Sequence, residues 1–262
     1  MSKKLTILSS IAIILSLFLA GAFAADEENQ NFDSAAAATA GGWHSVGSPS
    51  WGFSNTSKAG GPAGEGGGTM NYTKTGPKYY GDDDLGGALT EADAFSASGT
   101  IYMECDVPRV GYFDTTDPTH RTDFTGFQPI NTHVLNYAGA QMALFLDGLN
   151  VAQSANAPWL ASWTPRWWWF SYDGAGNIQG QVADNSSFTG TEGVNVITLS
   201  GSKTVDLDFD LDGFGLPQNG NNRNENRGTM YIDNLSYTIV PEPATVAILG
   251  LGSLVLLRRR RG

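Results

Sequence analysis

The residues of this chain best suited to ligand chemistry are the aromatic ones of Arg166–Phe170, which include three consecutive tryptophans. Side chains alternate between the two faces of a β-strand, so Trp168 is predicted to face one side and Trp167 and Trp169 the other. One set is expected to build the core. The other forms either a flat platform on which sugar rings stack or a surface covered by the loops around 158–165. Trp167 and Trp169 are therefore the candidate carbohydrate-stacking residues.

A row of carboxylates suggests cation chemistry in a second place. Four aspartates occupy alternate positions: Asp206, Asp208, Asp210 and Asp212. Apolar residues lie between them, which predicts a strand over 204–211 with its carboxylates on a solvated face. The stretch from Asp208 also matches the opening of a calcium loop, although its twelfth position is Asn219 instead of a bidentate acid. A strand face and a Ca²⁺ site using Asp208, Asp210 and Asp212 remain as alternatives.

The elements that must position these residues are predicted to be short strands. Long helix-period segments are absent between residues 40 and 240, and aromatic or β-branched runs alternate there with Gly, Pro, Asn and Asp clusters. This pattern predicts an all-β, antiparallel sandwich. The expected strands are 99–107, 110–113, 133–137, 141–146, 167–172, 178–182, 194–199, 204–211 and 229–239. The Gly60–Gly68 run is interpreted as turns.

The boundaries of the folded domain follow from composition. Residues 25–42 are acidic, small and unpatterned, which predicts a flexible leader, so the domain is expected to span 43–239. The chain has a single cysteine, which excludes an intramolecular disulfide. Cys105 shares its predicted strand face with Ile101, Met103 and Val107 and is expected in the core. The three histidines, His44, His120 and His133, lack zinc-ligand spacing.

The charge of the domain excludes some classes of partner. Six of the 15 basic residues lie at the two ends of the chain, so residues 25–239 carry 9 basic and 25 acidic residues, a formal net charge of −16. Such a surface repels nucleic acid and anionic lipid. Neutral sugars and cations are compatible with it.

The first residues have the features of a secretory signal. Two lysines precede the apolar run 5–20, and Ala22 and Ala24 supply small residues at the −3 and −1 positions that signal peptidase accepts. Cleavage is therefore expected after Ala24, with Ala25 as the first mature residue. The apolar run is short for a retained membrane anchor.

The last residues combine a motif, an apolar stretch and a basic cluster. The motif and the cluster consist of Pro241, Glu242, Pro243, Arg258, Arg259, Arg260 and Arg261. The prolines stop the preceding strand, and the apolar stretch 246–257 is expected to insert in the inner membrane as a short helix. The arginines would remain on the cytoplasmic side, which leaves the domain outside.

This order closely resembles the PEP-CTERM sorting signal. The resemblance covers about 22 residues, and the tripeptide matches residue by residue. It implies recognition by an exosortase, a membrane transpeptidase-like enzyme. It also implies transport to the surface or matrix of a bacterium that makes exopolysaccharide. An ordinary tail anchor is the alternative.

Several segments of the domain together resemble a concanavalin A-like jelly roll of the LamG or glucanase type. They are 59–67, 79–82, 85–99, 111–114, 170–173, 209–216 and 231–235. The last of them also fits a galactose-binding-like jelly roll. Glucanases of this fold usually carry E-x-D-x-x-E, because retaining hydrolysis needs two carboxylates about 5 Å apart. Glu91-Ala92-Asp93 and Glu104-Cys105-Asp106 both lack the third carboxylate, so no catalytic residue is assigned.

These observations predict an exported, noncatalytic β-sandwich with a structural or adhesive role in the cell envelope or matrix. A carbohydrate-binding module for exopolysaccharide is the first alternative, and a divergent glycoside hydrolase or lyase is the second. The expected partners are signal peptidase, the exosortase, the inner membrane through the tail and, in the first alternative, exopolysaccharide. No cofactor is expected apart from the Ca²⁺ alternative.

Sorting is predicted to depend on the tripeptide and not on tail hydropathy alone. Replacing Pro241, Glu242 and Pro243 by Ala leaves the apolar stretch and the arginines intact, so insertion should persist while exosortase recognition is lost. The variant should accumulate uncut in the inner-membrane fraction. Fractionation and intact-mass measurement test this, and equal location and mass for the variant and the wild type would reduce the tail to a plain anchor.

Overall fold

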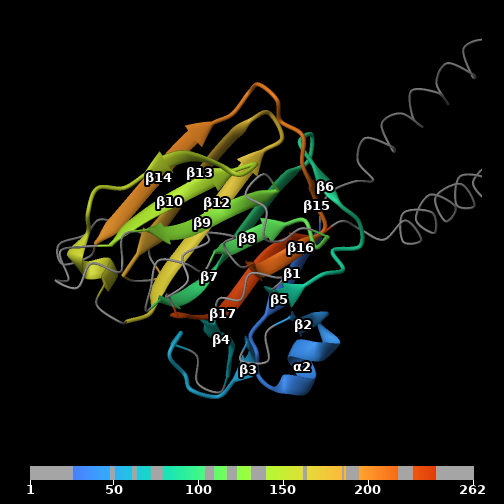
Figure 1. The fold of residues 1–262 in the computed structure, drawn as a ribbon, viewed down its shortest axis with the longest axis vertical. Coiled ribbons are helices and arrows are strands. Elements are labelled where there is room, and N and C mark those ends of the chain that lie inside the picture. The colour runs from blue at the N-terminus through green and yellow to red at the C-terminus, as the bar shows by residue number, and fades with distance from the viewer. Residues whose placement is uncertain are drawn as a thin grey trace, which may run out of the picture.

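The computed structural model of the chain is a two-layer β-sandwich (Figure 1). The structure describes residues 26–47, 51–60, 64–71, 79–103, 109–116, 123–130, 140–161, 164–184, 186, 195–217 and 227–239. The signal sequence and the sorting tail lie outside these ranges. Within them, no helix is long and apolar enough to cross a membrane.

The larger sheet has eight antiparallel strands. Its order is β14 (Val196–Ser202), β13 (Asn177–Ala183), β12 (Arg166–Asp173), β7 (Ala94–Met103), β17 (Arg227–Ile239), β4 (Glu65–Asn71) and β3 (Trp51–Ser54). β1 (Asp26–Gln30) also pairs with β17. The Trp-rich β12 therefore lies inside the sheet, between β13 and β7.

The smaller sheet has seven antiparallel strands and lies across the first (Figure 1). Its order is β11 (Leu149–Gln153), β10 (Gln141–Leu146), β9 (Phe124–Ile130), β8 (Val110–Phe113), β16 (Gly213–Pro217), β5 (Tyr79–Asp82) and β2 (Trp43–Val46). The remaining elements are α2 (Ala35–Ala40), the 3-10 helix η1 (Pro158–Ala161) and the pair β6 (Leu89–Thr90) and β15 (Asp210–Leu211). The chain passes repeatedly between the sheets, which confirms the predicted jelly-roll sandwich.

The core between the sheets is unusually aromatic. Trp168 and Phe170 from the larger sheet are at most 1% exposed, and their rings contact Phe127 from β9 with centroid separations of 6.4 and 5.9 Å. Tyr112 from β8 lies 6.0 Å from Phe170 and 4.9 Å from Phe214. Edge-to-face pairs of this kind add to the hydrophobic gain from burial, and they fix which face of each strand points inward.

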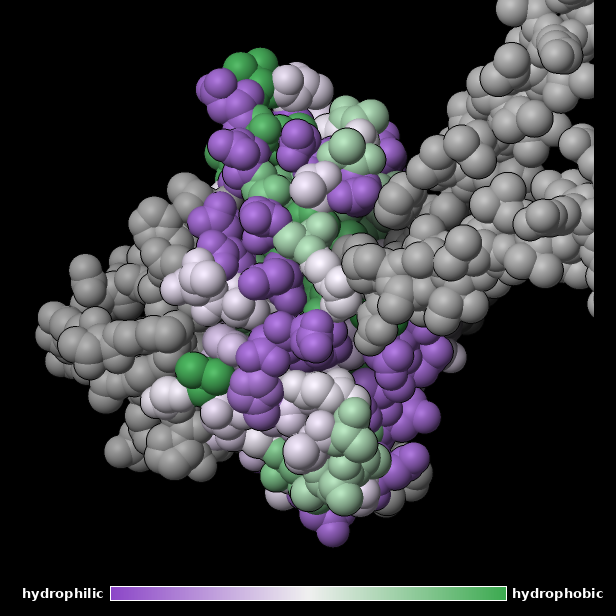
Figure 2. Space-filling view, turned by 90° about the vertical axis from the view of Figure 1, so that its right-hand side faces the viewer, coloured by the Kyte–Doolittle hydropathy of each residue, from purple (hydrophilic) through white to green (hydrophobic). Residues whose placement is uncertain are grey.

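On the side shown in Figure 2, hydrophilic and hydrophobic residues are interspersed, and the exposed alanines of α2 form a small pale green area near the lower end. α2 begins at Ser34, whose Oγ accepts a hydrogen bond of 3.1 Å from the Ala37 N–H. Ala38 alone of the helix is buried against the sandwich. This short helix closes the end of the sandwich beside β2 and β3.

Several predicted strands are confirmed. β8 and β10 have the bounds expected from the sequence, and β12, β13 and β17 contain or closely match theirs. Residues 104–108 and 133–137, including Cys105, lie outside the described residues. Three predictions about the fold are wrong. The segment 204–211 forms a strand only at β15, because Asp206 has a φ of +53° and interrupts extended backbone.

The glycine-rich run is the second wrong prediction, because its last residues belong to β4. Gly66 lies on the inner face, where a Cβ would come within 2.7 Å of the rings of Phe32 and Tyr80. The glycine therefore makes room for aromatic side chains from other strands. A local interpretation as a turn misses this packing role.

The predicted flexible leader is also corrected, because residues 26–42 belong to the sandwich. β1 pairs with β17 from Asp26 opposite Ile239 to Gln30 opposite Leu235. Phe32 follows it and is fully buried, with its ring 4.9 Å from that of Trp43. The composition of the segment is disorder-like, yet one buried phenylalanine and one strand ladder anchor it. The domain therefore begins near Asp26 instead of Trp43.

We predict that Phe32→Ala in the full-length chain lowers the free energy of unfolding by about 3 to 5 kcal/mol, because it leaves a cavity beneath β4. Urea unfolding followed by tryptophan fluorescence measures this loss. Asn31→Ala, at an exposed neighbouring position, is the matched control and should change stability by less than about 0.5 kcal/mol. Equal effects of the two substitutions would show that the segment is not part of the core.

Candidate functional site

β12 displays its tryptophans on both faces, as the sequence predicts. Arg166, Trp168, Phe170 and Tyr172 are buried, whereas Trp167, Trp169 and Ser171 are half-buried. Since Trp168 and Phe170 contact the smaller sheet, Trp167 and Trp169 lie on the side of the larger sheet turned away from it. We call this side the outer face.

The strand register shows which residues flank the two tryptophans on the outer face. Trp169 lies between Gln181 on β13 and Ser98 on β7, and Trp167 lies between Ala183 and Thr100. The row of Trp169 continues in both directions across the sheet. Its members are Thr198, Gln181, Trp169, Ser98, Ser236 and Asn29. One aromatic ring therefore lies in a row of hydroxyl and amide side chains.

The Trp169 indole is held by a relay of hydrogen bonds across three strands. Its Nε1–H donates to Gln181 Oε1 (3.0 Å), and Gln181 Nε2 donates to Thr198 Oγ1 (3.0 Å). The only polar group of the indole is thereby occupied. Trp169 can offer a ligand only the faces and edges of its ring, which is the geometry of stacking.

A depression of about 440 Å³ lies on the outer face beside this relay. Its lining residues come from the ends of β12, β13 and β14: Ser171, Asp173, Asn177, Ile178, Gln179, Ser200, Gly201 and Ser202. Asp173 accepts hydrogen bonds from the Asn177 side chain (2.7 Å) and from the backbone N–H groups of Ala175 and Asn177. The bond from the Asn177 side chain is the main reason that the pKa of Asp173 is lowered, so this exposed carboxylate stays ionised at neutral pH.

The sequence suggested the loops around 158–165 as a cover for Trp167 and Trp169. Their described residues instead contact Arg166 and the inner core. The buried Arg166 donates to the carbonyl oxygens of Trp159 and Pro165, and its guanidinium lies 5.3 Å from the centre of the Trp159 ring. Trp159 is half-buried and packs against the inner core. These contacts direct Trp159 inward.

A second loop covers the neighbouring part of the outer face. Ala59 is fully buried between Tyr102 and Tyr231, and Lys58 Nζ lies 5.2 and 5.3 Å from the centres of their rings. Glu65 accepts a hydrogen bond of 2.6 Å from the Ala59 N–H, which fixes this loop to β4. Among the described residues, these two loops leave uncovered the part of the outer face around β12, β13 and β14.

Asp233 lies at the boundary of this covered region, opposite Thr100 in the row of Trp167. It is 1% exposed, and its Oδ1 has no hydrogen-bond partner among the residues that the structure describes. Burial raises the pKa of Asp233 to about 6. A buried carboxyl group that is easily protonated avoids the cost of an unpaired charge.

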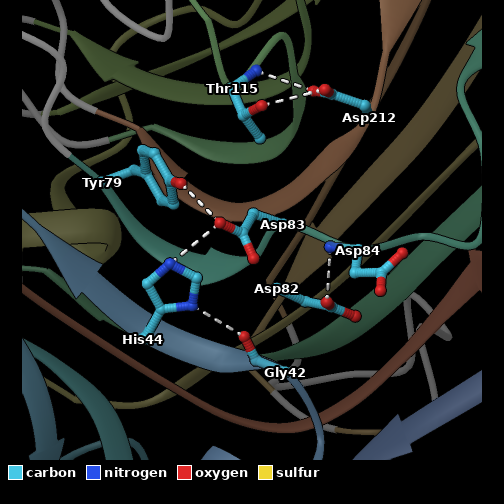
Figure 3. Close-up of polar contacts among 8 residues, drawn as sticks. All are labelled: Gly42, His44, Tyr79, Asp82, Asp83, Asp84, Thr115 and Asp212. Atoms are coloured by element: carbon cyan, nitrogen blue, oxygen red, sulfur yellow. Dashed lines mark hydrogen bonds and ion pairs between the residues drawn. The ribbon is translucent and has the colours of Figure 1, made fainter.

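The predicted calcium residues are not brought together. Asp208 and Asp210 are exposed, while both carboxylate oxygens of Asp212 accept hydrogen bonds from Thr115, from its N–H (2.7 Å) and its Oγ1 (2.9 Å) (Figure 3). Across the described ranges, no three His, Cys, Asp or Glu side chains are grouped so that they could hold a metal ion. Asn219 lies outside those ranges.

Of the two incomplete glucanase-like triplets, the structure describes the one that contains Glu91 and Asp93. Asp93 accepts hydrogen bonds from the Thr90 N–H (2.8 Å) and Oγ1 (2.7 Å), which caps the turn between β6 and β7. Glu91 is exposed, and its carbonyl oxygen accepts from the Tyr172 hydroxyl. Glu104 and Asp106 lie outside the described residues. Asp93 thus has a turn-forming role.

A polar cluster that sequence reasoning missed joins β2 to β5 (Figure 3). Asp83 Oδ2 lies 2.8 Å from His44 Nε2 and accepts a 2.8 Å hydrogen bond from the Tyr79 hydroxyl. His44 Nδ1 lies 3.0 Å from the carbonyl oxygen of Gly42. Burial, and then the bond to Asp83, raises the pKa of Tyr79, so the phenol remains a donor. The polar groups of this cluster are bonded to one another. Because 39 positions separate His44 from Asp83, no local sequence spacing could reveal the cluster.

Asp82, the neighbour of this cluster, points into the core instead. Its Oδ2 accepts from the Tyr237 hydroxyl (2.8 Å), which also accepts from Trp43 Nε1 (3.2 Å), and its Oδ1 accepts from the Asp84 N–H. Asp82 is 4% exposed, and burial raises its pKa to about 6 despite these bonds. The carboxyl group links the two sheets, because Tyr237 belongs to β17.

Comparison with known proteins identifies the C-terminal segment. The PEP-CTERM protein-sorting motif matches residues 240–261. The chain carries a PEP-CTERM sorting signal. This match confirms the predicted motif and indicates an exosortase-sorted, exported protein associated with the cell envelope. Ala22, Ala24 and Ala25 remain the predicted signal-cleavage residues.

The structural neighbours of the domain compared below are distant. A protein of unknown function from Shewanella oneidensis MR-1 has a TM-score of 0.46 at 11% identity, over 76% of this chain and 78% of that one. Arcelin-5, a lectin-like defense protein from Phaseolus vulgaris, has 0.42 at 9%, over 82% and 97%. A GH131 β-glucanase catalytic domain from Podospora anserina has 0.43 at 10%, over 75% and 84%. No curated protein matches the sequence.

We predict that stability falls as the pH rises from about 4 to about 6. The folded-state pKa of Asp82 is about 6 and its ordinary value is 3.8, so the folded chain binds more protons in this window. Asp82→Asn should remove up to about 3 kcal/mol of the pH-dependent change in the free energy of unfolding. The part of this change that is due to Asp233 should remain.

Urea unfolding of the full-length chain at pH 4.5 and pH 7 measures this difference. Asp210→Asn, at an exposed position, is the matched control and should keep the wild-type dependence. A pH dependence that Asp82→Asn leaves unchanged would show that Asp82 titrates normally in the folded chain.

Proposed function

We propose that this exported protein is a noncatalytic, adhesive module of the cell envelope that binds exopolysaccharide on the outer face of its larger sheet. The observation that carries the proposal is the pair Trp167 and Trp169, half-buried on a sheet face lined by hydroxyl and amide groups. Stacking on aromatic faces combined with peripheral hydrogen bonds suits a pyranose ring.

The position of the pair favours a polymer as the ligand. Both tryptophans lie on a strand in the interior of the sheet, with β13 and β14 on one side and β7 and β17 on the other. An extended chain can cross such a face without meeting the ends of the sandwich. Exopolysaccharide is the polymer that surrounds bacteria using this sorting signal, as the motif resemblance implies.

The sorting signal supports the adhesive part of the proposal. It sends the protein to the envelope, where binding a matrix polymer joins cell and matrix. The Asp93 carboxylate of the described glucanase-like pair takes part in a turn, and this supports the noncatalytic part.

We predict that Trp167→Ala with Trp169→Ala weakens polysaccharide binding more than folding. Each lost stacking contact should cost about 1 kcal/mol or more, so the double variant should bind roughly 30-fold more weakly. Affinity electrophoresis of the full-length chain in gels containing polysaccharide from the producing bacterium measures the loss.

Two controls separate binding from folding. Trp167→Phe with Trp169→Phe keeps two aromatic faces and should retain most of the affinity. Trp168→Ala removes a core ring and should unfold the domain, which sets the scale for a structural defect. Unchanged binding by the alanine pair, or unfolding as severe as that of Trp168→Ala, would contradict the proposal.

A further inference from the structure

The depression lies on the same face of β12, β13 and β14 as Trp169, which is not itself a lining residue. Ser171 follows Trp169 by two residues on the same face of β12, a separation of about 7 Å along the strand. Gln179 lies opposite Ser171 on β13, and Ser200 lies opposite Gln179 on β14. A sugar ring stacked on Trp169 therefore has its next polymer unit within reach of these three side chains.

We propose that this depression is the hydrogen-bonding subsite of the Trp platform, and that it selects uncharged polysaccharide over anionic polysaccharide. The inference rests on the proposed binding function and adds the substrate class and the residues that determine it. It also assigns Gln181 as the residue that positions the Trp169 ring.

The chemistry of the lining accounts for the selection. Its side chains offer hydroxyl and amide groups, and the hydroxyl groups of Ser200 and Ser202 form no hydrogen bonds within the described part of the chain. Among the described residues, no lysine or arginine lines the depression, and the one charged lining residue is Asp173. The lowered pKa of Asp173 keeps it ionised, so a uronate or sulfate group would meet a negative charge. The nearby Lys203 is paired with the buried Asp147.

Gln181 affects ligand binding by orienting the Trp169 ring and does not itself contact the ligand. Its Oε1 accepts from the indole and its Nε2 donates to Thr198, so both ends of the amide are occupied. Removing this amide frees the indole to adopt other rotamers, which lowers the fraction of molecules that present the ring for stacking. Gln181→Glu keeps the acceptor for the indole N–H, whereas Gln181→Leu removes it at similar size.

The test uses the full-length chain and three probes that differ in charge: dextran, a neutral glucan; alginate, a polyuronate; and chitosan, a cationic polymer. Affinity electrophoresis at low and at 0.5 M salt separates specific binding from charge attraction, since salt at about that concentration screens exposed charges beyond a few ångströms. Dextran should bind at both salt concentrations, while alginate should not bind at either. Tighter binding of alginate would overturn the selection. Loss of dextran binding at 0.5 M salt would overturn the assignment of a neutral ligand.

Two pairs of variants test the residues. Ser200→Phe fills the depression without touching either tryptophan and should weaken dextran binding at least about tenfold. Ala36→Phe is its matched control: Ala36 is exposed on α2, at the end of the sandwich beside β2 and β3, and the substitution should have little effect. Gln181→Leu should weaken binding about as much as Trp169→Ala does, and Gln181→Glu should restore most of it. Fluorescence of Trp169, read as the difference from Trp169→Phe, should change in Gln181→Leu and stay near wild type in Gln181→Glu.

The outcomes distinguish the two proposals. Suppose that dextran binding requires both tryptophans but is unaffected by Ser200→Phe. This result would support stacking on the Trp platform and would overturn the proposed subsite. Equal affinity of Gln181→Leu and Gln181→Glu would overturn the positioning role. Wild-type protein that binds none of the three probes, nor polysaccharide from the producing bacterium, would overturn the proposed function together with this inference.

Discussion

The hydroxyl group of Tyr112 is the contact on which the arrangement of the larger sheet depends. Tyr112 belongs to the smaller sheet, is fully buried, and reaches across the core to the boundary of β7 and β17. Its hydroxyl donates to the carbonyl oxygen of Ser96 (2.7 Å) and accepts from the Thr238 N–H (2.7 Å). The pairing of β7 with β17 shifts register between Asp233 and Ser236, so the ladder alone leaves backbone groups to be satisfied. Burial raises the pKa of Tyr112, which keeps the hydroxyl proton available.

The same tyrosine determines which way β12 faces. Its ring contacts Phe95 at 4.8 Å and Phe170 at 6.0 Å, so β7 and β12 are held with these side chains inward. A slip of one residue in β12 would move Trp167 and Trp169 into the core and Trp168 and Phe170 out of it. The inner packing therefore excludes that register, and the outer position of the two tryptophans follows from the core.

The sequence predicts those features of the fold that have a local cause. Alternation across Trp167, Trp168 and Trp169 is set by strand geometry, and the sorting tail is recognisable from its order of motif, apolar stretch and arginines. The failures have distant causes. Phe32 lies in a polar segment, and its burial depends on contacts with the rings of Trp43 and Tyr80, which come from strands β2 and β5. The alternating aspartates suggested a strand, but Asp206 has a positive φ and the segment pairs only at β15. The relay through Gln181 and Thr198 depends on register, which propensity does not specify.

The order of the strands also connects the candidate site to the sorting signal. β17 ends at Ile239, and the matched motif begins at residue 240, so the signal follows directly from a strand in the interior of the larger sheet. β7 pairs with β17 on one side and with β12 on the other. In an adhesive role, a force between the polymer and the envelope would pass from β12 through the ladders of β7 to β17. The hydrogen bonds of the β12–β7 and β7–β17 ladders would then bear this force together, instead of breaking one at a time. The hydroxyl group of Tyr112 joins β7 to β17 along this path, so the contact that sets the register also reinforces the connection between the proposed binding face and the tail.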